Sequence, residues 1–305
     1  MKKSAKRHQS KKQTEKKYIV KGESELLPFL LEQKIKSSRN ATKSILSRGQ
    51  VKVDGKTITQ HNAVLKPGQE IEIIENKEMQ RKSELMGIRI LYEDQDLIVI
   101  DKEAGILSVA AKHPNEWTAH YQLSLYVKDK NPRNRVFVVH RLDRDTSGVM
   151  MFAKNEKAKR ILQDNWKKMV TERIYTAMVE GEPAKKEDTI DSWLSENKAF
   201  KVYSSPKDNG GKRAVTHYHV AQTNGNYSLL TLTLETGRKN QIRVHLSDIG
   251  HPIVGDKKYG AQTNPLKRLG LHATTIKFKH PTSGKLMQFH SAVPKIFKLK
   301  TKTSV

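Results

Sequence analysis

The chain has 305 residues, a length that suits two domains or one large domain with a small appendage. Its 57 Lys and Arg residues exceed its 32 Asp and Glu residues. The resulting formal net charge of +25 indicates a polyanionic partner, with nucleic acid as the first candidate and an anionic membrane surface as the second. The absence of cysteine excludes disulfides, thiolate zinc sites and cysteine nucleophiles, and no apolar stretch approaches the ~20 residues of a membrane span.

Residues 1–17 carry eight basic side chains, one acid and almost no apolar residue. Such a segment cannot bury enough apolar surface to fold alone, so we expect a flexible basic arm, with a merely solubilising tail as the alternative. The segment also lacks the apolar core of a secretory signal. The cytoplasm is therefore the expected compartment.

Two helices are predicted at the start of residues 18–76. The first begins near Ser24, with Pro28 tolerated in its first turn. The second runs from an N-cap at Ser38 to Gly49. Three cations that could contact RNA lie on this second helix: Arg39, Lys43 and Arg48.

Tight strands follow these helices. Residues 51–53 and 70–73 alternate apolar and polar side chains, as strands do, and turns are expected at Asp54-Gly55 and Pro67-Gly68. Two helices and tight strands with a basic helix fit a compact RNA-binding unit. The alternative is an arbitrary small α/β module whose basic helix is merely solvated.

Residues 77–87 are charged and aperiodic and are interpreted as a linker, after which residues 88–305 form a larger domain. Few segments of this domain have a helical pattern of apolar residues, and residues 157–168 are the clearest predicted helix. Short strands mixed with few helices predict an α+β domain around a mostly antiparallel sheet. The clearest strands are 97–100, 136–139, 149–153, 174–179 and 229–234.

A dense polar loop, His140 to Gly148, separates two apolar strands. Loops on a rigid scaffold are where catalytic groups usually sit. The alternative is an ordinary turn, in which Asp145, Thr146 and Ser147 bond local backbone.

A second polar segment, 234–246, follows a strand and interleaves cations with apolar residues, so part of it must be buried. A buried Arg243 needs an anionic partner, and a loop aspartate is the obvious candidate. A third segment, 173–181, is predicted to be a strand with Tyr175 on one face. That tyrosine could stack on a flipped base, or it could be an ordinary sheet residue.

Together these segments resemble the RNA pseudouridine synthase family typified by the large ribosomal subunit synthases A, C and D. The strongest motif is His140-Arg141-Leu142-Asp143-x-x-Thr146-Ser147-Gly148. Four further motifs occur in the family's order between residues 90 and 294, including Thr236-Gly237-Arg238-x-x-Gln241-Ile242-Arg243-Val244-His245. Residues 38–55 resemble an S4-like RNA-binding domain, which precedes this fold in many members.

The resemblance implies a pseudouridine synthase fold and the isomerisation of uridines in ribosomal or transfer RNA, without cofactor or metal, by a monomer. It assigns catalysis to Asp143, Tyr175 and Arg243. Whether Asp143 attacks the sugar, attacks the base or abstracts a proton stays open. Arg141 would fill the space that the base vacates. The other expected substrate-binding residues are His140, Arg238, Gln241, Ile242, Arg39, Lys43 and Arg48.

Three departures from the family pattern concern substrate choice: Glu103 replaces a proline, Arg173 replaces a lysine, and Lys239-Asn240 replaces Thr or Ser followed by His. A non-catalytic RNA-binding protein of the same fold is one alternative. A metal-dependent hydrolase is the other, prompted by twelve histidines, but no compact zinc-ligand spacing supports it.

Overall fold

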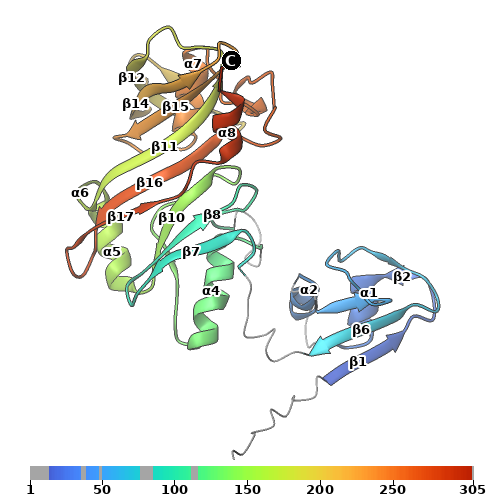
Figure 1. Ribbon diagram of the computed structural model, residues 1–305. Coiled ribbons are helices and arrows are strands. Elements are labelled where there is room, and N and C mark those ends of the chain that lie inside the picture. The colour runs from blue at the N-terminus through green and yellow to red at the C-terminus, as the bar shows by residue number, and fades with distance from the viewer. Residues whose placement is uncertain (1–13, 36–38, 48–49, 76–84, 111–115, 304–305) are drawn as a thin grey trace, which may run out of the picture. The chain divides into compact units, whose positions relative to one another are not determined.

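The computed structural model describes residues 14–35, 39–47, 50–75, 85–110 and 116–303 (Figure 1). The chain divides into two compact units, Met1–Glu84 and Leu85–Val305. Each unit has its own apolar core. No helix among the described residues is both long and apolar enough to cross a membrane.

The smaller unit is built on a four-stranded sheet of order β1-β6-β3-β4, with a separate β2–β5 pair and two helices. Leu26, Leu30, Ile45 and Leu46 from the helices pack against Ile71 and Ile73 of β6. The elements are β1 (Thr14–Ile19), β2 (Ser24–Glu25), α1 (Leu26–Glu32), α2 (Arg39–Ser47), β3 (Val51–Val53), β4 (Lys56–Thr57), β5 (Val64–Leu65) and β6 (Glu70–Glu75).

The predicted basic arm is too long, because residues 14–17 lie in β1 and pair with β6. Lys17 Nζ lies 2.7 Å from Glu70 and 3.2 Å from Glu72, so acids on the partner strand compensate its charge. The turn expected at Asp54-Gly55 is confirmed, since both residues have positive φ. Residues 1–13, 38, 48 and 49 lie outside the described residues, and with them the predicted N-cap at Ser38 and the cation Arg48.

The larger unit contains an eleven-stranded sheet of order β13-β12-β14-β15-β11-β16-β10-β8-β7, with β17 on β16 and β9 on β10. Among the strand pairings of the described residues, only β10–β16 is parallel, which confirms the expected mixed, mostly antiparallel α+β architecture. The strands are β7 (Ile88–Glu93), β8 (Leu97–Lys102), β9 (Phe137–Val138), β10 (Ser147–Ala153), β11 (Val170–Glu180), β12 (Glu187–Glu196), β13 (Val202–Ser205), β14 (Lys212–Thr223), β15 (Tyr227–Leu234), β16 (Leu271–Lys279) and β17 (Leu286–His290).

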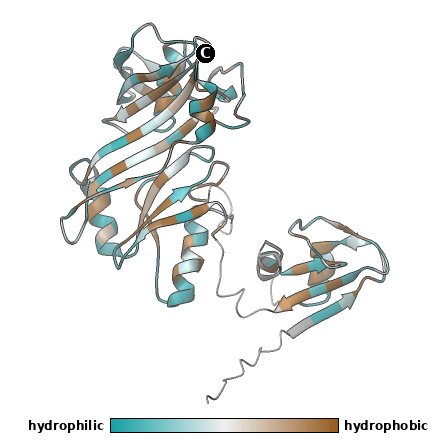
Figure 2. Cartoon of the chain, viewed as in Figure 1, coloured by the Kyte–Doolittle hydropathy of each residue, from teal (hydrophilic) through white to brown (hydrophobic). Residues whose placement is uncertain are grey.

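Helices cover both faces of this sheet near β8 and β10, and Figure 2 shows apolar and polar segments alternating along the strands. On one face, α4 buries Leu123 and Val127 against Met150 and Phe152 of β10. On the other face, Leu162 of α5 packs with the neighbouring β10 residues. Because side chains alternate across a strand and both faces of β10 are covered, all seven residues of β10 are buried.

The helices of the larger unit are α4 (Ala119–Lys130), α5 (Glu156–Asp164), α6 (Trp166–Met169), α7 (Gln241–Asp248), η1 (Lys257–Tyr259) and α8 (Lys295–Lys300).

One residue of β16 sets the register of two strands at the centre of the sheet. Ala273 pairs with Gly148 of β10 on one side and with Tyr175 of β11 on the other. At the usual strand spacing, the backbones of Gly148 and Tyr175 are roughly 10 Å apart. Gly148 is required there, because its φ is +113° and an added Cβ would lie 2.1 Å from the Ala273 carbonyl oxygen. The polar loop therefore ends, at Gly148, close to Tyr175.

Candidate active site

A cleft of about 470 Å³ opens where the polar loop, β11 and the start of α7 meet. Its volume lies in the range of sites that enclose a small ligand or a single base. Eight residues singled out in the sequence line it: His140, Arg141, Asp143, Tyr175, Arg238, Gln241, Ile242 and Arg243. The polar loop and the start of α7, which are almost 100 residues apart in the sequence, thus line the same cleft.

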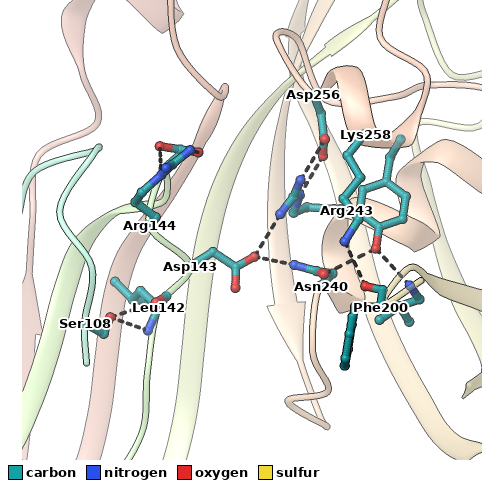
Figure 3. Close-up of polar contacts among 12 residues, drawn as sticks. Ser108, Leu142, Asp143, Arg144, Phe200, Asn240, Arg243, Asp256 and Lys258 are labelled. Carbon is teal, nitrogen blue, oxygen red and sulfur yellow. Dashed lines mark hydrogen bonds and ion pairs between the residues drawn. The ribbon is translucent and has the colours of Figure 1, made fainter. Parts of the chain in front are cut away.

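Asp143 is bonded through one of its two carboxylate oxygens (Figure 3). Its Oδ2 accepts from Nδ2 of Asn240 at 2.6 Å and from Nη1 of Arg243 at 3.2 Å. No hydrogen bond from a described residue reaches its Oδ1. The side chain is 30% exposed, so this second oxygen is available to a ligand in the cleft.

Arg243 is fixed by a second carboxylate, Asp256, which sequence reasoning did not identify as its partner. Nε and Nη2 of Arg243 donate to Asp256 at 2.7 and 2.8 Å in a two-point contact. Burial opposes the guanidinium charge. The hydrogen bonds and charges of Asp256 and Asp143 outweigh this effect and raise the pKa of Arg243 above its ordinary value. Asp256 thereby orients the guanidinium so that Nη1 remains for Asp143.

Asn240 is the second donor to Asp143, and it was noticed in the sequence only as a departure from the family pattern. It precedes α7 in the left-handed conformation, at φ 53°, which asparagine tolerates better than most residues. Its side chain does not cap the helix. Nδ2 instead donates to Asp143, while Oδ1 accepts from the hydroxyl of Tyr259 at 3.3 Å.

Tyr175 and Arg173 extend from the same face of β11 into the cleft, as their alternation predicts. Burial raises the pKa of Tyr175, with the positive charge of Arg173 opposing this effect, so its phenol is neutral at physiological pH. Nη2 of Arg173 donates to the carbonyls of Leu234 and Glu235 at 3.3 Å each. Arg173 thus ties β11 to the turn that leads into α7.

The polar loop is anchored from behind. Ser108 Oγ donates to the Leu142 carbonyl at 2.7 Å and accepts from the Leu142 amide at 3.1 Å. His140 Nε2 accepts from the Met151 amide at 3.0 Å, and burial together with the charge of Arg173 lowers the pKa of His140 to about 3. His140 is therefore neutral, and it holds the loop rather than offering a charge to phosphate.

Lys102 is a further anchor that the sequence did not reveal. It is fully buried, and its Nζ donates to the carbonyls of Glu103, Ile106 and Arg144 at 3.0, 2.8 and 3.1 Å. Burial lowers the pKa of Lys102 to about 8, although the charges of Asp145 and Asp143 act in the opposite direction. The ammonium thus joins the turn after β8 to the residue that follows Asp143.

We expect this lysine to make stability depend on pH. In the unfolded chain its pKa is the ordinary 10.5, against about 8 when folded. From about pH 8 to 10.5 the unfolded chain therefore holds a proton that the folded chain has lost. The Lys102 contribution to the free energy of unfolding rises across this window by about 3 kcal/mol in total and is constant below it. Urea unfolding at pH values below, within and above this window gives the free energy of unfolding of the wild type and of Lys102→Met. If this free energy changed with pH equally in both proteins, Lys102 would not be the source of the pH dependence.

Comparison with known proteins shows which family the chain belongs to. The sequence model of the RNA pseudouridylate synthase family matches residues 96–248. An RNA pseudouridine synthase of Bacillus subtilis, YhcT, is 34% identical over 274 residues, which are 87% of this chain and 88% of the relative. Ribosomal large subunit pseudouridine synthase D of Pasteurella multocida is 31% identical over 85% of each chain. The chain belongs to the RNA pseudouridylate synthase family.

Solved structures show the same fold. The human RNA pseudouridylate synthase domain containing 1 aligns with a TM-score of 0.55 at 25% identity, covering 68% of this chain and 84% of the other. Domain containing 4 aligns with a TM-score of 0.58 at 24% identity, covering 72% and 92%. The resemblance to pseudouridine synthases noted in the sequence is confirmed for the family, its fold and its reaction, so this synthase is an isomerase.

Not every sequence-predicted contact of the synthase can serve RNA directly. Gln241 is 3% exposed, and its amide is fully engaged: Oε1 accepts from Thr236 and the Arg238 amide, and Nε2 donates to Val215 and Thr216. Gln241 therefore builds the turn before α7 instead of binding substrate. Ile242, 5% exposed, presents only an apolar edge to the cleft.

The remaining predicted cations that lie among the described residues are exposed. Arg141 at the cleft has no hydrogen bond or ion pair to a described residue, and Arg238 donates to the Arg213 carbonyl through Nε, which leaves its other nitrogens free of described partners. Arg39 and Lys43 lie exposed on α2 of the smaller unit. Within the described ranges, no group of three acidic or histidine side chains could hold a metal ion.

Proposed function

We propose that this synthase isomerises specific uridines in ribosomal RNA and that Asp143 starts the reaction. The observation that carries the proposal is the half-bonded carboxylate, whose Oδ2 is held by two donors while Oδ1 remains available in the cleft. Ribosomal RNA is the proposed substrate because a relative 31% identical is named for the large ribosomal subunit. Transfer RNA is the alternative.

The reaction breaks the bond between ribose C1′ and uracil N1 and forms a bond between C1′ and C5. A proton leaves C5, and one is gained at N1, so nothing is oxidised or transferred to a second molecule. Asp143 acts as the ionised group that begins cleavage. Arg243, itself held by Asp256, fixes the carboxylate rotamer before the substrate arrives, which avoids reorganisation during the reaction.

The target base reaches Asp143 only after leaving its stack, at a cost of a few kcal/mol. We assign stacking on the base to Tyr175, a neutral aromatic ring beside Ile242 and Leu271 in the cleft wall. We assign the vacated space in the RNA to Arg141, whose exposed guanidinium has no described partner.

The smaller unit is proposed to be an S4-like RNA-binding domain. The exposed cations Arg39 and Lys43 on α2 support this role. If both contact phosphate, the double variant Arg39→Ala/Lys43→Ala of the full chain should show a slope of log affinity against log salt that is shallower by about 1.5. The matched control, Lys56→Ala/Lys66→Ala, removes two exposed cations of the same unit outside α2. Identical slopes for the two double variants would count against the assignment.

Pseudouridine mapping tests the function as a whole. Cytoplasmic RNA from cells with and without the gene is compared position by position. We expect one or more ribosomal RNA positions to lose pseudouridine without the gene and to regain it on complementation. A loss confined to transfer RNA would move the proposal to the alternative substrate, and unchanged maps of both RNAs would end it.

A further inference from the structure

Phe200 is an exposed aromatic residue that the fold of the larger unit does not explain. It lies in the turn between β12 and β13, it is 71% exposed, and its φ is +58°. A bulky residue in this conformation costs roughly 1 kcal/mol relative to glycine, and asparagine would also be tolerated better. Burial of the ring therefore contributes little to the stability of the fold, and the backbone conformation would be more favourable with another residue at this position.

The turn that carries Phe200 is nevertheless well ordered by hydrogen bonds. Asn197 Oδ1 accepts from the amides of Ala199 and Lys201 at 3.0 and 2.9 Å. The Phe200 amide donates to the Asn197 carbonyl at 2.9 Å. Lys258 Nζ donates to the Phe200 carbonyl at 2.9 Å, which joins the turn to η1 (Figure 3). These bonds hold the ring in place without covering it.

The surroundings of Phe200 are cationic. Lys239 Nζ lies 5.7 Å from the centre of its ring, within the range of a cation–π contact. Lys201 and Lys258 lie over the neighbouring Tyr259 ring at 5.9 and 5.7 Å. The nearby acid Glu196 is paired with Lys239. Cations beside an exposed ring suit a nucleotide, because phosphate meets the charges while the base stacks on the ring.

A surface hollow connects this turn to the active site. A cavity of about 500 Å³ is lined by residues on both sides of the turn, Glu196 and Val202, and by residues 237–239. Gly237 and Arg238 line both this hollow and the catalytic cleft. Lys239 is also the immediate neighbour of Asn240, which bonds Asp143. The hollow therefore extends from the catalytic cleft to the two ends of the turn that carries Phe200, although Phe200 itself does not line it.

We propose that Phe200 is a stacking platform for an unpaired RNA base adjacent to the target uridine, with Lys239 beside it for the phosphate. This inference rests on the proposed function and extends it to a second nucleotide subsite. The platform contributes binding and no chemistry, so its loss affects KM and leaves kcat at saturating RNA unchanged.

The test uses the full chain and RNA from cells that lack the gene. Phe200→Asn removes the ring while keeping a residue that tolerates the turn, so misfolding does not confuse the result. We expect KM to rise about tenfold, within the range for losing one base–aromatic stack, with an unchanged kcat. Leu286→Ala, which trims another exposed apolar side chain (51% exposed), should leave both constants unchanged. An active Phe200→Asn enzyme with the wild-type KM overturns the inference and leaves a protein partner as the ring's occupant.

A binding measurement separates this inference from the proposed function. The protein has three tryptophans of its own, and Trp166 lines the catalytic cleft, so the wild type supplies the reference. In Phe200→Trp, a short oligouridylate should quench the tryptophan emission more strongly than in the wild type, because a base stacks on the added indole. Phe200→Asn should lower the affinity for the same oligouridylate by the same factor at every salt concentration. Lys239→Ala should instead make log affinity depend less steeply on log salt concentration. If Phe200→Trp shows no more quenching than the wild type, the platform is refuted even if pseudouridine is formed. If the added quenching is seen in a protein that forms no pseudouridine, only the proposed function is refuted.

Discussion

Replacing Asp143 with asparagine is expected to abolish pseudouridine formation, lowering kcat by at least about 10³-fold, while RNA binding is retained. The amide has the shape of the carboxylate, and its oxygen can still accept from Asn240 and Arg243. It carries no charge, however, and can neither attack carbon nor take up a proton. The measurement pairs single-turnover kinetics with RNA binding of the same preparation.

The matched control is Asp145→Asn, two residues further along the same loop. Asp145 is 46% exposed and pairs with Arg144, away from the Asp143 contacts. It should retain activity within about twofold, because an exposed pair of this kind contributes little. Substantial activity in Asp143→Asn, or equal losses in the two variants, would remove Asp143 from its assigned role.

Arg243→Ala is expected to lower both activity and stability. Activity should fall about 10²- to 10³-fold, because Asp143 loses the guanidinium that orients it. Asp256, 1% exposed, is left without its two-point partner, and an uncompensated buried charge of this kind costs about 3–5 kcal/mol. Thermal unfolding should then shift down by roughly 10 °C. Arg243→Lys should recover only part of either property, since an ammonium cannot serve two carboxylates in fixed directions.

A double variant separates the two effects. In Arg243→Ala/Asp256→Ala the buried charge is gone together with its partner, so part of the lost stability should return while activity stays low. Recovery of activity along with stability would mean that Arg243 acts only by maintaining the fold. No recovery of either would mean that Asp256 is not the group left uncompensated.

The strands of the larger unit are predictable because burial on two faces leaves a clear trace in the sequence. The predicted run 149–153, which forms most of β10, is apolar throughout, and β10 is covered by α4 on one side and α5 on the other. Tyr175 could be placed on the cleft side of β11 from its alternation with Ile174. The predicted helix 157–168 is interrupted at Asn165, where α5 ends and α6 begins.

The site is less predictable wherever a role depends on a partner distant in sequence. Asp256 contacts Arg243 because the chain after α7 turns back toward the helix, which the sequence pattern does not indicate. The predicted partner, an aspartate of the polar loop, already accounted for the charge of Arg243, so no second acid was sought. Two polar residues of α7, Gln241 and His245, are buried, and both form hydrogen bonds with Thr216 of β14. In the smaller unit, the lysines of β1 obscured a strand, because Glu70, which compensates Lys17, lies 53 residues further along the chain.

The register at Ala273 has a consequence for how the enzyme tolerates motion. The strand that follows the Asp143 loop and the strand that carries Tyr175 are paired with the same residue of β16, on its two edges. When the sheet twists or bends, both are displaced together, and the separation between carboxylate and ring changes much less than the position of either. The opening between Asp143 and Tyr175 can thus keep its width while the surrounding sheet flexes.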